Sequence, residues 1–192
     1  MEDLIIDEVR GTVFLQKAGM SLDVGSVAKG YAAGLAVQAA KEAGLTSALI
    51  NTGGHIITVG EPQSGARDLW SLGIQSPELD AEQGDIIGTV HFNDLILSVS
   101  GGYQRFFVVD GVAYNHIIDP ETLMPASRYK QVAVIHENSA LADMLSTALF
   151  IMAQEEGAAL AEKYGAEVLW VGVNDERKVH GDGGLFSSIL EP

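Results

Sequence analysis

The sequence predicts an α+β fold, mainly an antiparallel sheet with helices packed on one face. Most of the chain consists of short apolar and β-branched runs separated by glycine-containing turns, which is typical of strands joined by hairpins. Two longer segments, 26–43 and 139–154, instead repeat apolar residues with the spacing of a helix. Hairpin-linked strands pair antiparallel, and helices that lie apart from them along the chain pack on the sheet.

The composition restricts the class of protein. With 47% hydrophobic and 19% charged residues, the 192-residue chain can bury a sizeable core, and we expect a single domain over 1–192. The net charge of −15 argues against nucleic acid and anionic membranes as partners, because both need clustered Lys and Arg. The absence of cysteine excludes disulfides and thiolate chemistry. There is no membrane-spanning stretch and no basic export signal, so the chain as given is expected to be cytoplasmic.

The first elements are expected in this order. Strands over 4–9 and 12–16 turn at Arg10-Gly11, and a helix over 26–43 follows them, with Gly44 as its stop. Its apolar face is expected to consist of Val27, Tyr31, Leu35, Ala39 and Ala43. The next strands are 47–51, 55–59, 70–75, 86–92 and 95–100.

The second half begins with a hairpin around Asp110-Gly111, a strong turn signal, which joins strands 103–109 and 112–118. After a strand over 131–136, Ser139 is expected to cap a helix that runs to about Gln154. The remaining expected elements are a short helix over 158–164, a strand over 167–173, a polar turn over 174–184 and an apolar piece over 185–190.

The start of the first helix has unusual chemistry. Lys29 places a cation at the positive end of the helix dipole, which is unfavourable unless a phosphate binds there. Gly30 and Gly34 each weaken the helix by roughly 1 kcal/mol, which indicates that something approaches its backbone closely. Asp23, before the turn at Gly25, is a candidate to hold a metal or a ligand hydroxyl. A strand–helix corner with a solvated lysine and a capping aspartate explains this stretch equally well.

Two further groups are candidates. Asp143, Ser146 and Thr147 project from one side of the second helix, and such an all-oxygen cluster suits a hard cation such as Mg²⁺. His116 is a candidate general base, with Asp119 at the turn that follows it. The other histidines show no metal-ligand spacing, and a helix-end aspartate or a structural strand histidine are the ordinary alternatives.

Glycine breaks supply another signal. Gly53-Gly54 and Ser100-Gly101 either form bulges or lie under a planar ligand. Taken in order, five blocks of the chain closely resemble the ApbE family, the FAD:protein FMN transferases. These blocks are 23–32, 51–54, 98–103, 116–120 and 142–149.

The resemblance implies an ApbE-like, T-fold-like domain that transfers FMN from FAD to a threonine of an acceptor flavoprotein, with Mg²⁺ and release of AMP. It implies that Asp23 and Lys29 contact FAD together with the glycine turns, and that His116, beside Asp119, deprotonates the acceptor. It also implies a metal site formed by the Ser26 backbone oxygen, Asp143 and Thr147, with Ser146 adjacent.

The chain departs from the family pattern in several places. Relatives carry a large additional N-terminal segment, so we expect a short form that self-associates or pairs with a second chain. Gly34 stands where aspartate is common, and 121–123 lacks the usual arginine and glycine. Ser64-Gly65-Ala66 is followed by Arg67, so no complete acceptor motif is present. Two rival interpretations remain open, an Mg²⁺-dependent FAD pyrophosphatase and a non-catalytic nucleotide-binding remnant.

Overall fold

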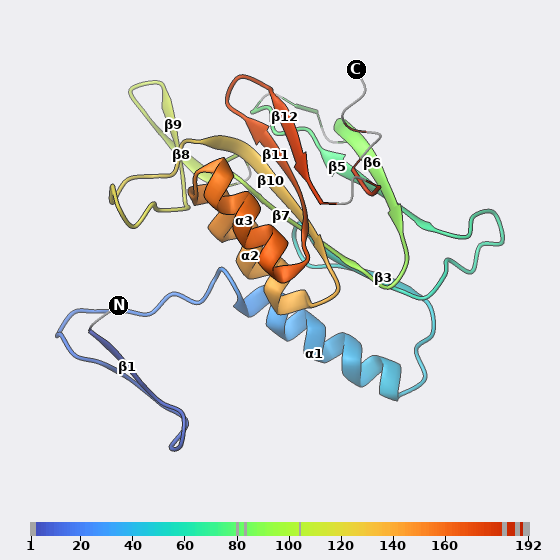
Figure 1. Ribbon diagram of the computed structural model, residues 1–192, viewed down its shortest axis with the longest axis horizontal. Helices are drawn as coiled ribbons and strands as arrows, with labels where there is room; N and C mark the ends of the chain where they lie inside the picture. The colour runs from blue at the N-terminus through green and yellow to red at the C-terminus, as the bar shows by residue number, and fades with distance from the viewer. Residues whose placement is uncertain are drawn as a thin grey trace.

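A computed structural model describes residues 3–79, 81–82, 84–103, 105–181, 184–186 and 189. Its centre is a six-stranded sheet with the strand order β12-β11-β10-β7-β4-β3 (Figure 1). Every neighbouring pair in this sheet is antiparallel. The strands are β3 (Ala48–Asn51), β4 (His55–Val59), β7 (Ile96–Gly101), β10 (Tyr129–His136), β11 (Glu167–Gly172) and β12 (Arg177–His180).

The helices lie together on one face of the sheet (Figure 1). They are α1 (Ala28–Glu42), α2 (Ser139–Ile151) and α3 (Gln154–Tyr164). The opposite face is covered by the antiparallel pair β5 (Trp70–Gln75) and β6 (Ile86–Phe92). The predicted α+β fold with an antiparallel sheet and helices on one face is therefore confirmed.

Both faces of the central sheet are buried. Val132 and Trp170 pack against Leu149 of α2 on the helix side, whereas Ile135 packs with Val90 of β6 on the other side. Accordingly β10 is buried at every position from 131 to 136, in place of the alternation that a half-exposed strand shows.

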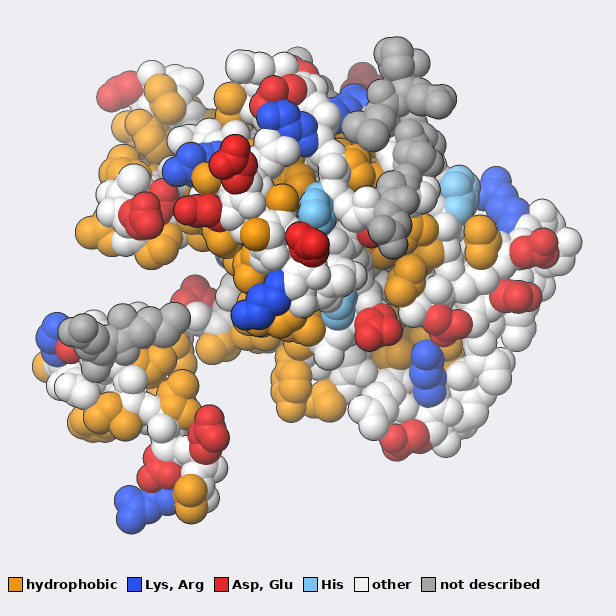
Figure 2. Space-filling model, viewed as in Figure 1, with side chains coloured by type: hydrophobic (Ala, Val, Ile, Leu, Met, Phe, Trp, Pro, Cys, Tyr) orange, Lys and Arg blue, Asp and Glu red, His pale blue; other side chains and the backbone are white. Residues whose placement is uncertain are grey.

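Two hairpins stand apart from the central sheet. They are β1 (Leu4–Asp7) with β2 (Thr12–Leu15), and β8 (Phe106–Val109) with β9 (Val112–Asn115). The β1–β2 hairpin projects away from the body in Figure 1, and Figure 2 shows hydrophobic side chains gathered on it. Phe14 is 62% exposed and Phe107 58% exposed. An isolated two-stranded hairpin is marginally stable in water, so these surfaces are unusual for a monomer.

The predicted apolar face of the first helix is wrong. Tyr31 and Leu35 are 59% and 51% exposed, whereas Gly30, Ala33 and Val37 form the buried stripe of α1. The larger side chains point outward because α1 lies so close to α2 that only small residues fit between them. The helix does end where Gly44 predicted, since this residue has a φ of +99°.

The expected boundaries after residue 95 also need correction. Asn138, not Ser139, caps α2, because its side chain accepts a hydrogen bond from the Leu141 N–H. α2 ends at Ile151, and Gln154 already begins α3. The strand expected over 95–100 is shifted by one residue, since β7 begins at Ile96 and Gly101 is its last residue.

The chain around the second hairpin and the C-terminus differs in similar ways. β8 and β9 are shorter than expected, although Asp110 and Gly111 do form the turn, with φ of +49° and +81°. The expected polar turn over 174–184 contains strand β12. Of the final apolar piece, Phe186 and Ile189 are buried in the core, whereas residues 187–188 and 190 lie outside the described residues.

Candidate functional site

The site is built on the close approach of α1 to α2. A Cβ added to Gly30 would lie 2.4 Å from the Ser139 carbonyl oxygen and 2.5 Å from the Asp143 Cβ, so glycine is required there. At Gly34 the nearest atom, the Ser139 Cβ, would be 3.0 Å away. The sequence predicted that something approaches these two glycines. The structure shows that it is the neighbouring helix.

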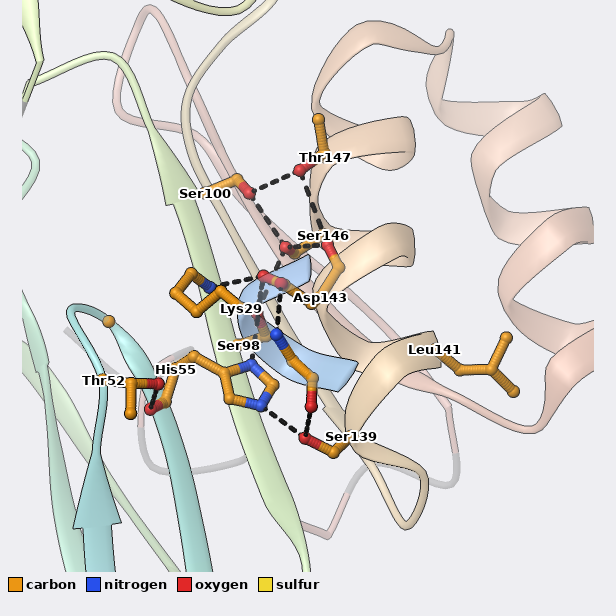
Figure 3. A network of polar contacts seen from close by, with 12 residues as sticks. Lys29, Thr52, His55, Ser98, Ser100, Ser139, Leu141, Asp143, Ser146 and Thr147 are labelled. Atoms are coloured by element: carbon orange, nitrogen blue, oxygen red, sulfur yellow. Dashed lines mark hydrogen bonds and ion pairs between the residues drawn. The ribbon is translucent and has the colours of Figure 1, made fainter. Parts of the chain in front are cut away.

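Asp143 is the centre of the polar contacts in Figure 3. Its side chain is 4% exposed. Oδ2 accepts a 2.7 Å hydrogen bond from the Gly30 N–H, and Oδ1 forms an ion pair with the Lys29 ammonium. Lys29 itself keeps 33% of its side chain exposed, so it reaches from solvent to a buried carboxylate. A negative charge at this depth is compensated by the Lys29 ammonium, the Gly30 N–H and the hydroxyl of Ser98, which donates to Oδ1 at 3.5 Å.

A row of hydroxyl groups continues from Asp143 along the end of β7 (Figure 3). The hydroxyl of Ser146 lies 2.8 Å from that of Ser100 and 3.3 Å from that of Ser98, and the Ser100 hydroxyl lies 3.4 Å from that of Thr147. Ser146 and Thr147 also donate back to the carbonyl oxygen of Asp143. The structure thus brings together the predicted metal ligands Asp143, Ser146 and Thr147. Ser100, which was predicted to bind the cofactor, lies beside them.

His55 completes this group, and the sequence interpretation missed it. The ring is fully buried, with Nε2 2.8 Å from the Ser139 hydroxyl and Nδ1 4.0 Å from Oδ1 of Asp143. Burial, and secondarily the Lys29 ammonium, lower the pKa of His55 from 6.5 to about 4 against the opposing effect of Asp143. The ring is therefore neutral near pH 7 and forms no ion pair with Asp143.

A signal for His55 existed in the sequence. It begins the strand directly after Gly53-Gly54, and the alternation of 55–59 places it on the same strand face as Ile57 and Val59. Ile57 and Val59 pack with Ala33 and Val37 of α1, so this face is the one that meets the helices. Histidine spacing could not reveal this, because the neighbour of His55 is an aspartate on a distant helix.

The remaining predicted ligand-binding residues lie in turns and at a strand end. Asp23 accepts a 2.7 Å hydrogen bond from the Gly25 N–H and so shapes the exposed turn before α1, where Ser26 also lies. Gly53 and Gly54 have φ of +71° and +82° in the turn between β3 and β4. At Gly101 a Cβ would lie 2.3 Å from the Tyr103 ring. The glycines are thus explained by the fold, and their ligand contacts stay predictions.

His116 and Asp119 are placed apart from Asp143. In the described part of the chain, no hydrogen bond or ion pair joins them to the group around Asp143. Asp119 accepts a 2.8 Å hydrogen bond from the Glu121 N–H and organises the turn of 119–124, in which Leu123 has a φ of +57°. The neighbouring Ile117 packs in the same buried cluster as Leu145 and so anchors His116 beside α2.

The exposed ring of His116 has a defined orientation. Its Nδ1 lies 3.2 Å from the carbonyl oxygen of Arg105, which can only accept a hydrogen bond. In the neutral ring, Nδ1 therefore carries the proton and Nε2 carries the lone pair. This is the arrangement that a general base needs.

Two hollows border this region. One of about 540 Å³ lies between α1 and the start of α2, with Gly30 and Ser139 in its wall. The other, of about 430 Å³, lies between the 77–79 loop and Gly102, Tyr103 and Asn115. The second adjoins both the end of β7 and the residue before His116.

The donor set fits a divalent cation with a preference for oxygen. Asp143 supplies a carboxylate, and Ser146 and Thr147 supply hydroxyls on the same helix face. No cluster of three or more His, Asp or Glu occurs among the described residues, so a cation here would also use hydroxyls, carbonyls or ligand oxygens. Mg²⁺ takes such mixed shells and keeps several waters.

The sequence of the chain is similar to that of known proteins. The model of the ApbE family matches residues 1–170. The chain is 35% identical to an FAD:protein FMN transferase from Klebsiella pneumoniae, across 90% of this chain and 52% of the relative. It is 34% identical to an FAD:protein FMN transferase from Treponema pallidum, across 93% of this chain and 50% of the relative.

A solved structure agrees with the sequence comparison. The crystal structure of an ApbE protein from Thermotoga maritima superposes with a TM-score of 0.82 at 30% identity, covering 94% of this chain and 57% of that protein. The chain thus spans about half the length of the curated relatives it matches. None of the helices in the described part of the chain is long and apolar enough to cross a membrane.

Proposed function

Because the chain belongs to the ApbE family, we propose that it takes part in transferring FMN from FAD to a threonine of an acceptor flavoprotein. One observation carries the proposal, namely the convergence of Lys29, the Gly30 N–H and Asp143 where α1 begins. A lysine and a helix start favour a pyrophosphate, and a buried carboxylate with nearby hydroxyls favours a divalent cation. FAD contains the pyrophosphate that would use both.

The residues have separate proposed roles. Lys29, which is one-third exposed, would bind the pyrophosphate of FAD, and Asp23 would contact a hydroxyl group of FAD. Asp143, Ser146 and Thr147, with the backbone oxygen of Ser26, would hold Mg²⁺. When bound, Mg²⁺ supplies charge neutralisation for the phosphate groups during transfer.

The transfer needs a nucleophile and a base. The acceptor hydroxyl oxygen forms a bond to the phosphorus of the FMN half, and the bond from that phosphorus to the bridging oxygen breaks, so that AMP leaves with the electron pair. Nε2 of His116, which carries the lone pair, takes the hydroxyl proton. The exposure of this ring suits an acceptor that arrives from solution as a separate protein.

The exposed hairpins bear on the partners of the chain. A second copy or another chain that covers β1–β2 and β8–β9 would bury their apolar side chains, among them Phe14 and Phe107. Such a partner would stand beside the loop of His116, which follows β9 directly. We therefore include a second chain in the proposed active assembly.

The deciding experiment follows the mass of an acceptor. The chain is incubated with FAD, Mg²⁺ and a purified flavoprotein domain that bears a target threonine, and the acceptor is then weighed by mass spectrometry. Addition of one FMN, absent when that threonine is replaced by valine, supports transfer. Free FMN and AMP formed without acceptor indicate the pyrophosphatase instead. FAD binding without either product would overturn the proposal in favour of a non-catalytic binding protein.

A further inference from the structure

His55 begins β4 and points between the two helices that carry the proposed metal site (Figure 3). Its ring is fully buried, although it follows an exposed turn. Buried imidazoles normally have partners at both nitrogens, because an unpaired polar atom in the interior is costly. The partners of its two nitrogens therefore show what the ring does.

The hydrogen bonds of Ser139 fix the tautomer of His55. The Ser139 hydroxyl lies 2.6 Å from the carbonyl oxygen of Gly30, which can only accept, so its single proton is used there. Towards Nε2 of His55, at 2.8 Å, the same hydroxyl can only accept. Nε2 therefore carries the ring proton, and Nδ1 carries a bare lone pair.

Nδ1 is the unusual atom. It is buried, and among the described residues it has no hydrogen-bond partner. It lies 4.0 Å from Oδ1 of Asp143. Oδ1 already has two partners, the Lys29 ammonium and the Ser98 hydroxyl, so Nδ1 is the atom of the pair that lacks one. A cation shared by Nδ1 and Oδ1 would take the place of the Lys29 ammonium, which is one-third exposed and is proposed to bind the pyrophosphate. Two ligands that share one cation at about 2.0–2.2 Å each are at most about 4.0–4.4 Å apart, when they lie on opposite sides of it, so the observed separation of 4.0 Å allows both atoms to reach one cation.

His136 shows what a satisfied buried histidine looks like in the same chain. It is 9% exposed. Its Nδ1 accepts a 2.8 Å hydrogen bond from the Asn138 N–H, and its Nε2 lies 2.9 Å from the carbonyl oxygen of Tyr164. Both nitrogens are used in folding, which is not true of His55. His136 is therefore the matched control.

We propose that Nδ1 of His55 is a further donor to the divalent cation held by Asp143, and that it tunes this site towards Mn²⁺ relative to Mg²⁺. The proposal rests on the proposed function, since it concerns the same metal site. Mg²⁺ prefers oxygen ligands, whereas transition metals gain more from an imidazole nitrogen. The expectation from the sequence, a site of oxygen donors alone, is thereby extended by one nitrogen.

The test is electron paramagnetic resonance of Mn²⁺ bound to the whole chain. We expect hyperfine couplings from a directly bound ¹⁴N, replaced by ¹⁵N couplings in protein labelled with ¹⁵N-histidine. His55→Gln should remove them and weaken Mn²⁺ binding roughly 10-fold or more while changing Mg²⁺ binding much less. His136→Gln and His116→Ala should keep both the couplings and the affinity.

The possible outcomes distinguish a failure of the role proposed for His55 from a failure of the metal site at Asp143. Mn²⁺ that binds to wild type, is lost in Asp143→Asn and shows no nitrogen coupling would overturn the role of His55 and leave the site intact. Mn²⁺ binding that does not depend on Asp143 would overturn both. If His55→Gln does not fold, the labelled wild type and His116→Ala still decide, because a spectrum without nitrogen coupling contradicts the proposal by itself.

Discussion

The backbone N–H of Gly30 donates a 2.7 Å hydrogen bond to Oδ2 of Asp143, which joins the first turn of α1 to the buried side of α2. This contact requires the absence of a side chain at position 30, since a Cβ there would overlap the Ser139 carbonyl and the Asp143 Cβ. It also holds Lys29 next to the carboxylate. One glycine therefore determines both the packing of the two helices and the geometry of the candidate site.

We expect Gly30→Ala to lower the free energy of unfolding by about 1–3 kcal/mol, the usual cost of overpacking. This loss should appear although alanine favours a helix over glycine by roughly 1 kcal/mol. Gly34→Ala is the control, because its Cβ would be 3.0 Å from the Ser139 Cβ and needs a smaller shift. Urea unfolding measures both. Equal stability of Gly30→Ala and wild type would show that the helices separate without cost.

Sequence patterns predicted the fold class and most strands, because hairpin turns and strand alternation are local signals. They failed where tertiary packing reverses a local preference. Tyr31 and Leu35 have the spacing of a core stripe, yet they are exposed because α2 comes too close to admit them. The buried face of a helix that packs through glycine and alanine cannot be identified from the sequence of that helix alone.

The candidate site was predictable to a similar degree. Asp143, Ser146 and Thr147 share a helix face, so their neighbourhood follows from helix geometry. His55 reaches Asp143 only because β4 pairs with β7 beside α2, and no spacing along the chain encodes that relationship. Ser139 was interpreted as a cap, but its hydroxyl instead links His55 to the backbone of Gly30.

The stability of the metal-free protein should depend on pH through His55. Its pKa is about 4 in the folded chain and 6.5 when unperturbed. Above pH 6.5 the ring is neutral in both states. Between pH 6.5 and about 4 the unfolded chain binds a proton that the folded chain does not, so the free energy of unfolding falls as the pH falls. The slope is at most roughly 1.4 kcal/mol per pH unit.

Urea unfolding in chelator-treated buffers across this pH range measures the effect. Carboxylates add their own slope to every variant, so the informative quantity is the difference between two proteins. We expect His55→Gln to reduce the slope relative to wild type. Identical slopes for wild type and His55→Gln would mean that the buried ring titrates normally.

The chain should associate with itself or with a second chain. It exposes 11654 Å², whereas a compact monomer of 20.3 kDa exposes about 8,800 Å². Much of the exposed apolar surface lies on the two hairpins. We expect light scattering to show a mass that rises with concentration, and Phe14→Lys to reduce it. Leu79→Lys, at an equally exposed apolar residue on another loop, should not. A constant monomer mass over a wide concentration range contradicts the prediction.

His116 should affect the rate of transfer and not the binding of FAD. Removing a general base typically slows a reaction by about 10²–10⁴-fold, and we expect His116→Ala to do so. The ring is exposed, and its Nδ1 contact to the Arg105 carbonyl is local, so the fold should tolerate the change. Single-turnover transfer and FAD titration separate the two effects. An equal loss of affinity and rate would place His116 in the binding pocket.

Metal and FAD should bind with positive coupling, and this coupling should depend on Asp143. The carboxylate, hydroxyl and carbonyl ligands leave part of the octahedral shell of Mg²⁺ to water, and pyrophosphate oxygens would complete it. Each ligand should therefore raise the affinity of the other by the same factor, as linkage requires. Calorimetric titration of FAD with and without Mg²⁺ measures this factor.

Asp143→Asn is the suitable variant for this measurement, because an amide oxygen still accepts the hydrogen bond from the Gly30 N–H while the charge is removed. We expect it to abolish the coupling and to keep the far-ultraviolet circular dichroism of wild type. Met144→Leu serves as a control, since it changes an exposed side chain next to Asp143 on the same helix. If FAD binds equally well with and without Mg²⁺, and Asp143→Asn changes neither binding nor activity, then Asp143 serves only to compensate Lys29 and to join the two helices.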